Sequence, residues 1–292
     1  MNQNFDIKDT EMPRLLDAEL LEYIREDIPY FDLTTTLLGS DFEKAKLEIK
    51  TREEIVVACS EEAARIAELL GCKVEFFVPS SKRVKTGETI MIIEAKGETL
   101  HQAWKLTQVL LEYACGMATY ANDMLLNAQK VNKDCEILVT RKSIPFAKKF
   151  AIRALLCGGI LPHRLGLSES ILVFSHHRAL FKDSDAFKEG FKELRLRAVE
   201  KKVVIECESF NDAMEMLSLG ADVIQMDKCD IQMLAELMEY KQKEFPSAKI
   251  IAAGGINKMN VGEFAKTGVD AIITSSPYQA KMADISVKWT KI

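Results

Sequence analysis

The chain has 292 residues, of which 48% are hydrophobic and 28% charged, and its formal net charge is −5 at pH 7. This is an ordinary globular composition, and its acidic balance argues against general nucleic-acid binding. The sequence has no apolar run near the roughly 18 residues of a membrane span, a polar start at residues 1–9 and seven scattered cysteines. We therefore expect a cytoplasmic protein with no nucleic-acid or membrane partner.

The first hundred residues predict a small α+β domain. Leucines at helical spacing indicate a helix over residues 13–25, and the proline at position 29 indicates a loop over 28–34. A second helix starts with Ser60 as its N-cap and stops at Gly71. Strands are expected at 45–50, 55–59, 73–78 and 89–95, with a basic turn at 80–87 and a long helix at about 99–130.

Beyond the long helix, short β-rich runs alternate with amphipathic helices. Strands are expected at 136–139, 171–174, 203–205, 223–226, 249–252 and 271–273. Helices are expected at 150–156, 183–200, 210–219, 231–245 and 258–267. Residues 157–161 or the C-terminal tail could add a seventh strand. Alternating strands and helices predict a parallel sheet, either doubly wound or closed into a barrel. No GxGxxG motif follows a strand, so a dinucleotide-binding domain is unsupported.

Every strand of this second region ends in polar or small residues. In a (β/α) barrel the carboxyl ends of the strands form one rim, where active sites are built. Cations follow the early strands, carboxylates the middle strands, and glycines and hydroxyls the late strands. The cations are Arg141, Lys142, Lys148, Lys149, Arg153, His163, Arg164 and His177. The carboxylates are Glu206 and Asp227, and the late group is Gly254, Gly255, Ser275 and Ser276.

These three groups suit a phosphorylated sugar with a second anionic group. The cations would hold an acidic co-substrate or a diphosphate. The carboxylates would bind ribose hydroxyls or Mg²⁺ and stabilise a developing oxocarbenium cation. The late glycines and serines would wrap a 5-phosphate. Each signal also has a purely structural interpretation. Lys148 and Lys149 could be solvated lysines at the start of a helix, and Gly254-Gly255 and Ser275-Ser276 could be simple turns.

Several motifs resemble the quinolinate phosphoribosyltransferase family, also called nicotinate-nucleotide pyrophosphorylases. The family's threonine-arginine-lysine motif stands at 140–142, its histidine-arginine pair at 163–164, and its aspartate-leucine-threonine motif at 32–34. Its glutamate strand matches 205–208, its aspartate strand end 225–227, and its glycine-glycine loop 253–256. The resemblance runs from about residue 15 to 278 and is strongest to the ModD branch, which is associated with molybdenum transport.

The resemblance implies an α/β fold in which an incomplete (β/α) barrel follows an N-terminal α/β sandwich domain. The expected boundaries are 1–105 for the sandwich, 106–276 for the barrel, and 277–292 for a tail that packs back on the sandwich. It also implies a homodimer, or a higher oligomer, whose sites are shared between subunits and receive Lys105 from the partner. The helix face formed by Val109, Leu110, Tyr113 and Met117 would supply the interface core.

The implied reaction is phosphoribosyl transfer from magnesium-bound phosphoribosyl pyrophosphate to a nitrogen heterocycle or a related acidic acceptor, without an organic cofactor. Glu206, Asp227 and Lys142 would be catalytic, with magnesium near the two carboxylates. Lys105, Arg141, Lys148, His163, Arg164 and His177 would bind substrate, and Gly254, Gly255, Ser275 and Ser276 phosphate.

The chain departs from the family pattern where the dicarboxylate acceptor would bind. Lys105 and Lys148 stand where the family has arginine, and Phe174 stands where it has lysine. Ser275 replaces the last loop's glycine. We therefore expect an acceptor other than quinolinate. Two alternatives stay open: a true quinolinate enzyme of NAD biosynthesis, and a protein that binds a nucleotide, phosphate or molybdate in a former transferase pocket.

Overall fold

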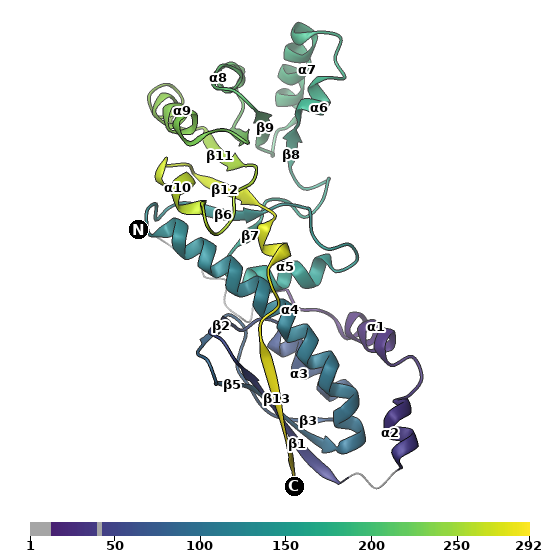
Figure 1. The fold of residues 1–292 in the computed structure, drawn as a ribbon. Helices are drawn as coiled ribbons and strands as arrows, with labels where there is room; N and C mark the ends of the chain where they lie inside the picture. Colours follow the sequence, from purple (N-terminus) through teal and green to yellow (C-terminus); the bar gives the residue numbers. More distant parts are fainter. Residues whose placement is uncertain (1–12, 40–42) are drawn as a thin grey trace. The chain divides into compact units, whose positions relative to one another are not determined.

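The structure is a computed structural model that describes residues 13–39 and 43–292, so the polar start at residues 1–9 lies outside it. The chain packs into two compact units (Figure 1). The first comprises Met1–Asn122, Ser143–Gly159 and Pro277–Ile292, and the second Asp123–Lys142 and Ile160–Ser276. The chain therefore passes between the units at 122/123, 142/143, 159/160 and 276/277. The domain boundaries expected from the sequence stay predictions.

The first unit is built on an antiparallel sheet with the strand order β13-β1-β5-β3. These strands are β1 (Lys44–Thr51), β3 (Lys73–Phe77), β5 (Thr89–Lys96) and β13 (Ile285–Lys291); β2 (Ile55–Val56) pairs with β4 (Arg83–Val84). The helices are α1 (Asp17–Asp27), α2 (Leu33–Leu38), α3 (Ser60–Leu69), α5 (Lys148–Cys157) and most of α4 (Gly97–Gln129). β13 lies antiparallel to β1, with Ala45 opposite Lys291 and Thr51 opposite Ile285.

Two local predictions in this unit were wrong. Residues 33–38 form helix α2 rather than ending a loop, because the Asp32 carboxylate caps it by accepting the Thr35 backbone N–H at 3.1 Å. Ser60 is the first residue of α3 and not its N-cap, which is Cys59 with φ 56°. The Ser60 N–H is instead bound by the Ser80 hydroxyl at 3.3 Å.

The second unit contains a parallel sheet with the order β7-β6-β12-β11-β10-β9-β8. Its strands are β6 (Glu136–Val139), β7 (Leu161–Pro162), β8 (Ile171–Val173), β9 (Val203–Cys207), β10 (Val223–Asp227), β11 (Lys249–Ala253) and β12 (Ala271–Thr274). Its helices are α6 (Ser175–Arg178), α7 (Ser184–Arg197), α8 (Phe210–Ser218), α9 (Ile231–Glu244) and α10 (Val261–Lys266). The 3₁₀ turn Ser276–Gln279 follows β12.

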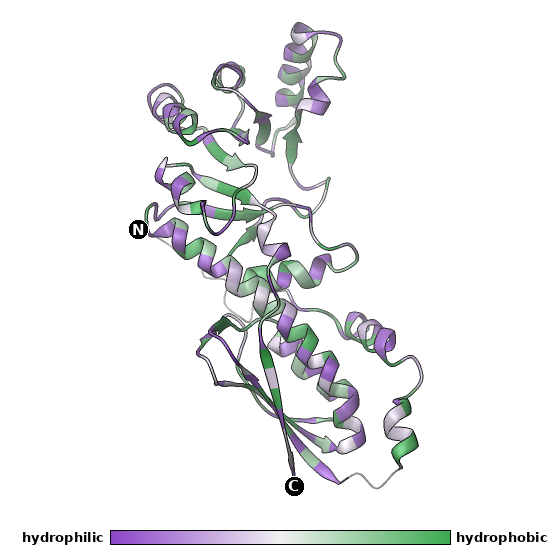
Figure 2. Ribbon diagram, viewed as in Figure 1, coloured by the Kyte–Doolittle hydropathy of each residue, from purple (hydrophilic) through white to green (hydrophobic). Residues whose placement is uncertain are grey.

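This order is that of an incomplete barrel. β12 pairs with β6, which brings the last strand of the series next to the first, and within the described residues β7 and β8 are the two unpaired edges. Apolar side chains fill one face of the sheet, among them Leu172, Val204, Val223 and Ile273, and the strands are largely hydrophobic in Figure 2. The predicted α/β fold with an incomplete barrel and a separate small domain is confirmed, and β7 is its seventh strand.

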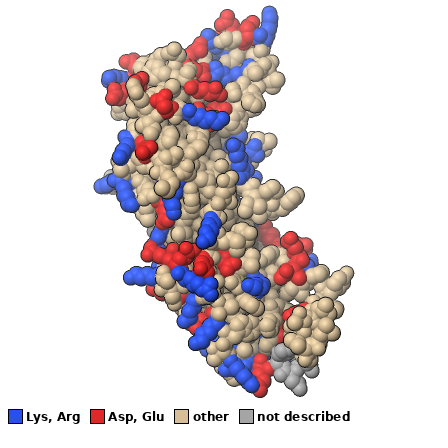
Figure 3. Space-filling model, viewed as in Figure 1, with Lys and Arg blue, Asp and Glu red and all other residues tan. Residues whose placement is uncertain are grey.

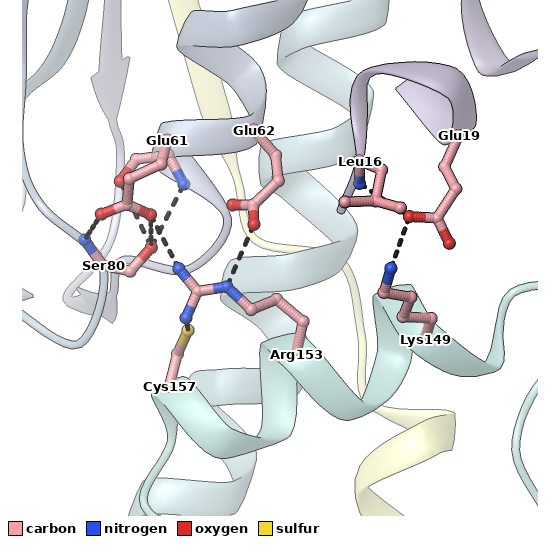
Figure 4. A network of polar contacts seen from close by, with 9 residues as sticks. Leu16, Glu19, Glu61, Glu62, Ser80, Lys149, Arg153 and Cys157 are labelled. Carbon is pink, nitrogen blue, oxygen red and sulfur yellow. Dashed lines mark hydrogen bonds and ion pairs between the residues drawn. The ribbon is translucent and has the colours of Figure 1, made fainter. Parts of the chain in front are cut away.

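A buried ionic network joins α3, α5 and the turn at Ser80 within the first unit (Figure 4). The Arg153 guanidinium, 1% exposed, contacts the carboxylates of Glu61 at 2.9 Å and Glu62 at 3.1 Å and donates to the Cys157 sulfur at 3.3 Å. The Ser80 N–H also binds Glu61, at 2.9 Å. Arg153 therefore stabilises the first unit and is not one of the rim cations that the sequence predicted.

The surface mixes charges of both signs. Lysine, arginine and acidic side chains are interspersed over the face drawn in Figure 3, without one dominant basic stripe. In the described part of the chain, no helix is sufficiently long and apolar to traverse a lipid bilayer.

Candidate active site

The rim of the second unit begins at the threonine-arginine-lysine motif. The Thr140 N–H donates to the Thr274 carbonyl at 3.0 Å, which joins the ends of β6 and β12. The Lys142 N–H donates to the Thr140 hydroxyl at 3.1 Å, so the chain turns sharply at Arg141. Arg141 and Lys142 are both exposed beyond this turn. The motif thus presents two cations at the carboxyl end of the strand, where the sequence predicted them.

A second pair of basic residues, His163 and Arg164, follows β7. Arg164 is 9% exposed, and burial together with the nearby charge of Arg141 lowers its pKa. Burial and the charge of Arg164 lower the pKa of His163, which therefore favours its neutral form near pH 7. Among residues 13–39 and 43–292, no ion pair joins Arg141 or Arg164 to a carboxylate. Two neighbouring arginines without an acidic partner form a site suited to an anion.

Phe174 contacts both Arg164 and His177. The Arg164 guanidinium carbon is 5.6 Å from the centre of the Phe174 ring, and the His177 ring stacks on the Phe174 ring with centres 5.8 Å apart and planes at 21°. His177 Nδ1 accepts the Phe174 backbone N–H at 3.0 Å, which leaves Nε2 to carry the proton of a neutral ring. The aromatic ring thus occupies the position beside the buried arginine where the family pattern has a cation.

The two predicted carboxylates lie on neighbouring strands, and Glu206 has a polar partner on the strand that carries Asp227. Gln225, in register with Glu206, donates from Nε2 to Glu206 Oε2 at 3.1 Å. Burial, followed by the charge of Asp227, raises the pKa of Glu206. Gln225 is 6% exposed, and its Oε1 has no hydrogen-bond partner among the described residues. Sequence reasoning missed Gln225; its signal is that it stands two residues before Asp227, on the same face of the strand.

The glycine loop after β11 packs directly against the end of β10. Gly254 and Gly255 have φ values of +92° and +71°, which favour glycine. A Cβ on Gly254 would lie 2.6 Å from the Lys228 backbone nitrogen and 3.0 Å from Asp227 Oδ1, so this approach requires glycine. Beside it, the Thr274 hydroxyl donates to the Ile256 carbonyl at 2.6 Å and accepts the Ser276 N–H at 3.0 Å.

The remaining predicted site residues, Lys105 and Lys148, belong to the first unit. The Lys105 ammonium lies 4.6 Å from the centre of the Trp104 ring and 3.4 Å from Gln108 Oε1. Lys148 is exposed at the start of α5, and its neighbour Lys149 pairs with Glu19 at 2.6 Å. Lys149 is therefore bound within the first unit, and the participation of Lys105 and Lys148 in the site stays a prediction.

The carboxylates fit the magnesium ion expected with phosphoribosyl pyrophosphate. Among the described residues, no group of three or more His, Cys, Asp or Glu is placed to hold a metal ion. Magnesium usually takes one or two carboxylates and fills its other positions with water and phosphate oxygens. Glu206 and Asp227 match that donor set, and a cation beside them would relieve the repulsion that contributes to the raised pKa of Glu206.

Two family models match the chain. Residues 32–115 match the family model for the N-terminal domain of quinolinate phosphoribosyl transferase, and residues 117–288 match that for its C-terminal domain. The chain belongs to the quinolinate phosphoribosyl transferase family. The predicted family is thus confirmed over most of the sequence, and with it a transferase of the phosphoribosyltransferase, or pyrophosphorylase, type.

Individual relatives align with most of this chain and with nearly all of their own length. A protein named "Putative pyrophosphorylase ModD" from Pasteurella multocida is 35% identical over 93% of this chain and 96% of its own length. One with the same name from Rhodobacter capsulatus is 36% identical over 86% of this chain and 96% of its own. The crystal structure of NadC from Streptococcus pyogenes has a TM-score of 0.83 and 22% identity, covering 100% of this chain and 99% of that one. The similarity to the ModD branch is confirmed.

Proposed function

We propose that this phosphoribosyltransferase transfers phosphoribose from phosphoribosyl pyrophosphate to a nitrogen heterocycle with fewer anionic groups than quinolinate. The observation that carries the proposal is the arrangement around Arg164. This buried arginine has an aromatic ring on one side and Arg141 as its charged neighbour. A planar acceptor could stack near Phe174, and a single anionic group could pair with the arginines.

In the proposed reaction, a lone pair of the acceptor nitrogen forms a bond to carbon 1 of the ribose. The bond from carbon 1 to the diphosphate oxygen breaks, and the diphosphate leaves with that electron pair. Glu206 and Asp227 stabilise the positive charge that develops on the ribose ring and hold its hydroxyls. Lys142 and Arg141 offset the charge of the departing diphosphate, and the Gly254–Gly255 loop with Ser275 and Ser276 holds the 5-phosphate.

Magnesium is part of the proposal, held by Glu206 and Asp227 directly or through water. When bound, it would neutralise charge on the diphosphate and so make it a better leaving group. The same two carboxylates disfavour the alternative of a protein that only binds phosphate or molybdate. Glu206, a half-buried carboxylate beside Asp227, repels a free oxyanion that brings no cation of its own.

We also propose that the enzyme is a homodimer with sites completed by Lys105 of the partner. The interface expected on α4 needs correction, because Leu110 and Met117 are buried in the chain itself and Tyr113 is the exposed member, at 44%. Exposed apolar side chains gather instead around α2, where Tyr30, Phe31, Leu33, Leu37 and Leu38 are all at least 59% exposed. Such a set is typical of an interaction surface. The cytoplasmic location stays a prediction.

The decisive experiment measures diphosphate release from phosphoribosyl pyrophosphate and magnesium with a panel of dicarboxylic, monocarboxylic and neutral nitrogen heterocycles. We expect one of the latter two classes to be the preferred acceptor. The control is the double variant Glu206→Gln, Asp227→Asn, which sets the background rate. If calorimetry detects no binding of phosphoribosyl pyrophosphate and no acceptor releases diphosphate above this background, the transferase proposal is wrong.

A further inference from the structure

Lys228, directly after Asp227 at the end of β10, has an unusual backbone. Its φ is +54°, in the left-handed region. In the described ranges, the other non-glycine residues with a positive φ are Cys59, Ser81 and Phe146. This conformation is unfavourable for an L-residue, because its Cβ comes too close to the following carbonyl oxygen. Such strain persists where the surrounding structure enforces it, and it concentrates at functional sites. Lys228 was not among the site residues predicted from the sequence.

The surroundings of Lys228 enforce this conformation from three directions. Its N–H donates to the Ala253 carbonyl at 2.9 Å, which ties it to the end of β11. Cys229, the next residue, is buried and anchors the chain on the other side. Gly254 leaves the space that Lys228 fills, since a Cβ there would meet the Lys228 nitrogen and its Cγ, each at 2.6 Å. The strained lysine and the glycine are therefore matched to each other.

The side chain of Lys228 is placed to meet a ligand at the glycine loop. Its Cγ lies against Gly254, and 80% of the side chain is exposed. The ammonium is 4.0 Å from the Asp227 carboxylate, a contact that contributes little stability at a surface. Asparagine adopts a left-handed backbone more readily than lysine, so local stability does not explain a lysine here. A compact cation beside a loop of glycines suits a phosphoryl group.

We propose that Lys228 is a substrate-binding residue whose ammonium group binds a phosphoryl group held at the Gly254–Gly255 loop. This inference rests on the proposed function, which supplies the ligand class: phosphoribosyl pyrophosphate carries a 5-phosphate and a diphosphate. Lys228 adds a cation to the carboxylate side of the rim. It thereby complements the charge of Arg141, Lys142 and Arg164 on the other strands.

The test separates the charge of Lys228 from its strain. Calorimetry measures the binding of ribose 5-phosphate and, separately, of magnesium diphosphate to the wild type and to Lys228→Met, Lys228→Arg and Lys228→Asn. Methionine keeps the length of the side chain without its charge. The methionine variant should bind one of the two ligands about tenfold to a hundredfold more weakly. Arginine keeps the charge and should bind within a few-fold of wild type. The ligand whose affinity falls identifies the phosphoryl group that Lys228 binds.

Thermal unfolding supplies the second readout. Lys228→Asn should lose affinity like the methionine variant yet raise the midpoint of unfolding by about 2–4 °C, because asparagine relieves part of the strain. Lys266→Met, an exposed lysine on α10, is the matched control and should change neither quantity. Wild-type affinity of Lys228→Met for both ligands would overturn the inference, as would an asparagine variant no more stable than wild type. A wild type that binds neither ligand would instead contradict the proposed function itself.

Discussion

Replacing Phe174 with lysine tests how the acceptor is selected. A lysine ammonium in place of the ring would lie about as far from the Arg164 guanidinium as the ring centre does, which is 5.6 Å. At an effective dielectric constant of about 20, two like charges at that distance repel by about 3 kcal/mol. The Phe174→Lys variant without ligand should therefore have a lower free energy of unfolding than wild type. A dicarboxylate that pairs with both cations should restore the lost stability.

The assay compares kcat/KM for quinolinate with that for monocarboxylic and neutral heterocycles, in the wild type and in Phe174→Lys. We expect poor use of quinolinate by the wild type. We expect a gain of about tenfold to a hundredfold in the variant, the value of one charge-assisted hydrogen bond. Phe174→Met removes the ring without adding charge and should show no gain. Efficient use of quinolinate by the wild type would refute the reasoning, because the ring would then not exclude a second carboxylate.

Four further outcomes follow from the same contacts. Glu206→Gln and Asp227→Asn should each lower kcat strongly with an unchanged circular dichroism spectrum; full activity in both would remove the carboxylates from catalysis. Mixing inactive Lys105→Ala and Glu206→Gln subunits should restore part of the activity, and its absence in verified heterodimers would indicate self-contained sites. Arg153→Met should lower the free energy of unfolding by about 3–5 kcal/mol, because two buried carboxylates lose their cation; urea unfolding measures this, and a neutral effect would contradict it. Because the pKa of His163 is lowered on folding, the unfolded chain binds more protons below about pH 6.5. Stability should therefore fall as the pH drops through that range, less so in His163→Asn; equal slopes would contradict the assignment.

Much of the barrel could be predicted from the sequence because its signals are local. Each strand of the second unit is a short apolar run followed by polar or small residues, and the strand ends then meet at one rim by topology alone. The sorting of charges along the chain likewise predicts Arg141, Arg164, Glu206 and Asp227 as residues of this rim. The predictions of specific roles for these residues await experiment.

What the sequence did not reveal depends on contacts between distant segments. Arg153 reads as one more cation after a strand, and only the packing of α3 against α5 encloses it with Glu61 and Glu62. Lys228 reads as an ordinary strand-end lysine, and its left-handed backbone results from Gly254, 26 residues later. Helix α2 was missed because its cap, Asp32, follows a proline-containing turn closely. The periodicity of apolar residues along the chain carries no information about such contacts between distant segments.

The pairing of β1 with β13 affects the order in which the protein can fold during synthesis. Thr51 and its partner Ile285 are separated by 234 residues, which a ribosome adds in roughly 12–47 s at about 5–20 residues per second. During that interval β1 has only β5 beside it, and its other edge presents unpaired backbone groups. The barrel strands all emerge within that time. The first sheet can therefore gain β13 only after all the barrel strands have been synthesised, and until then the edge of β1 is open to pairing with other strands.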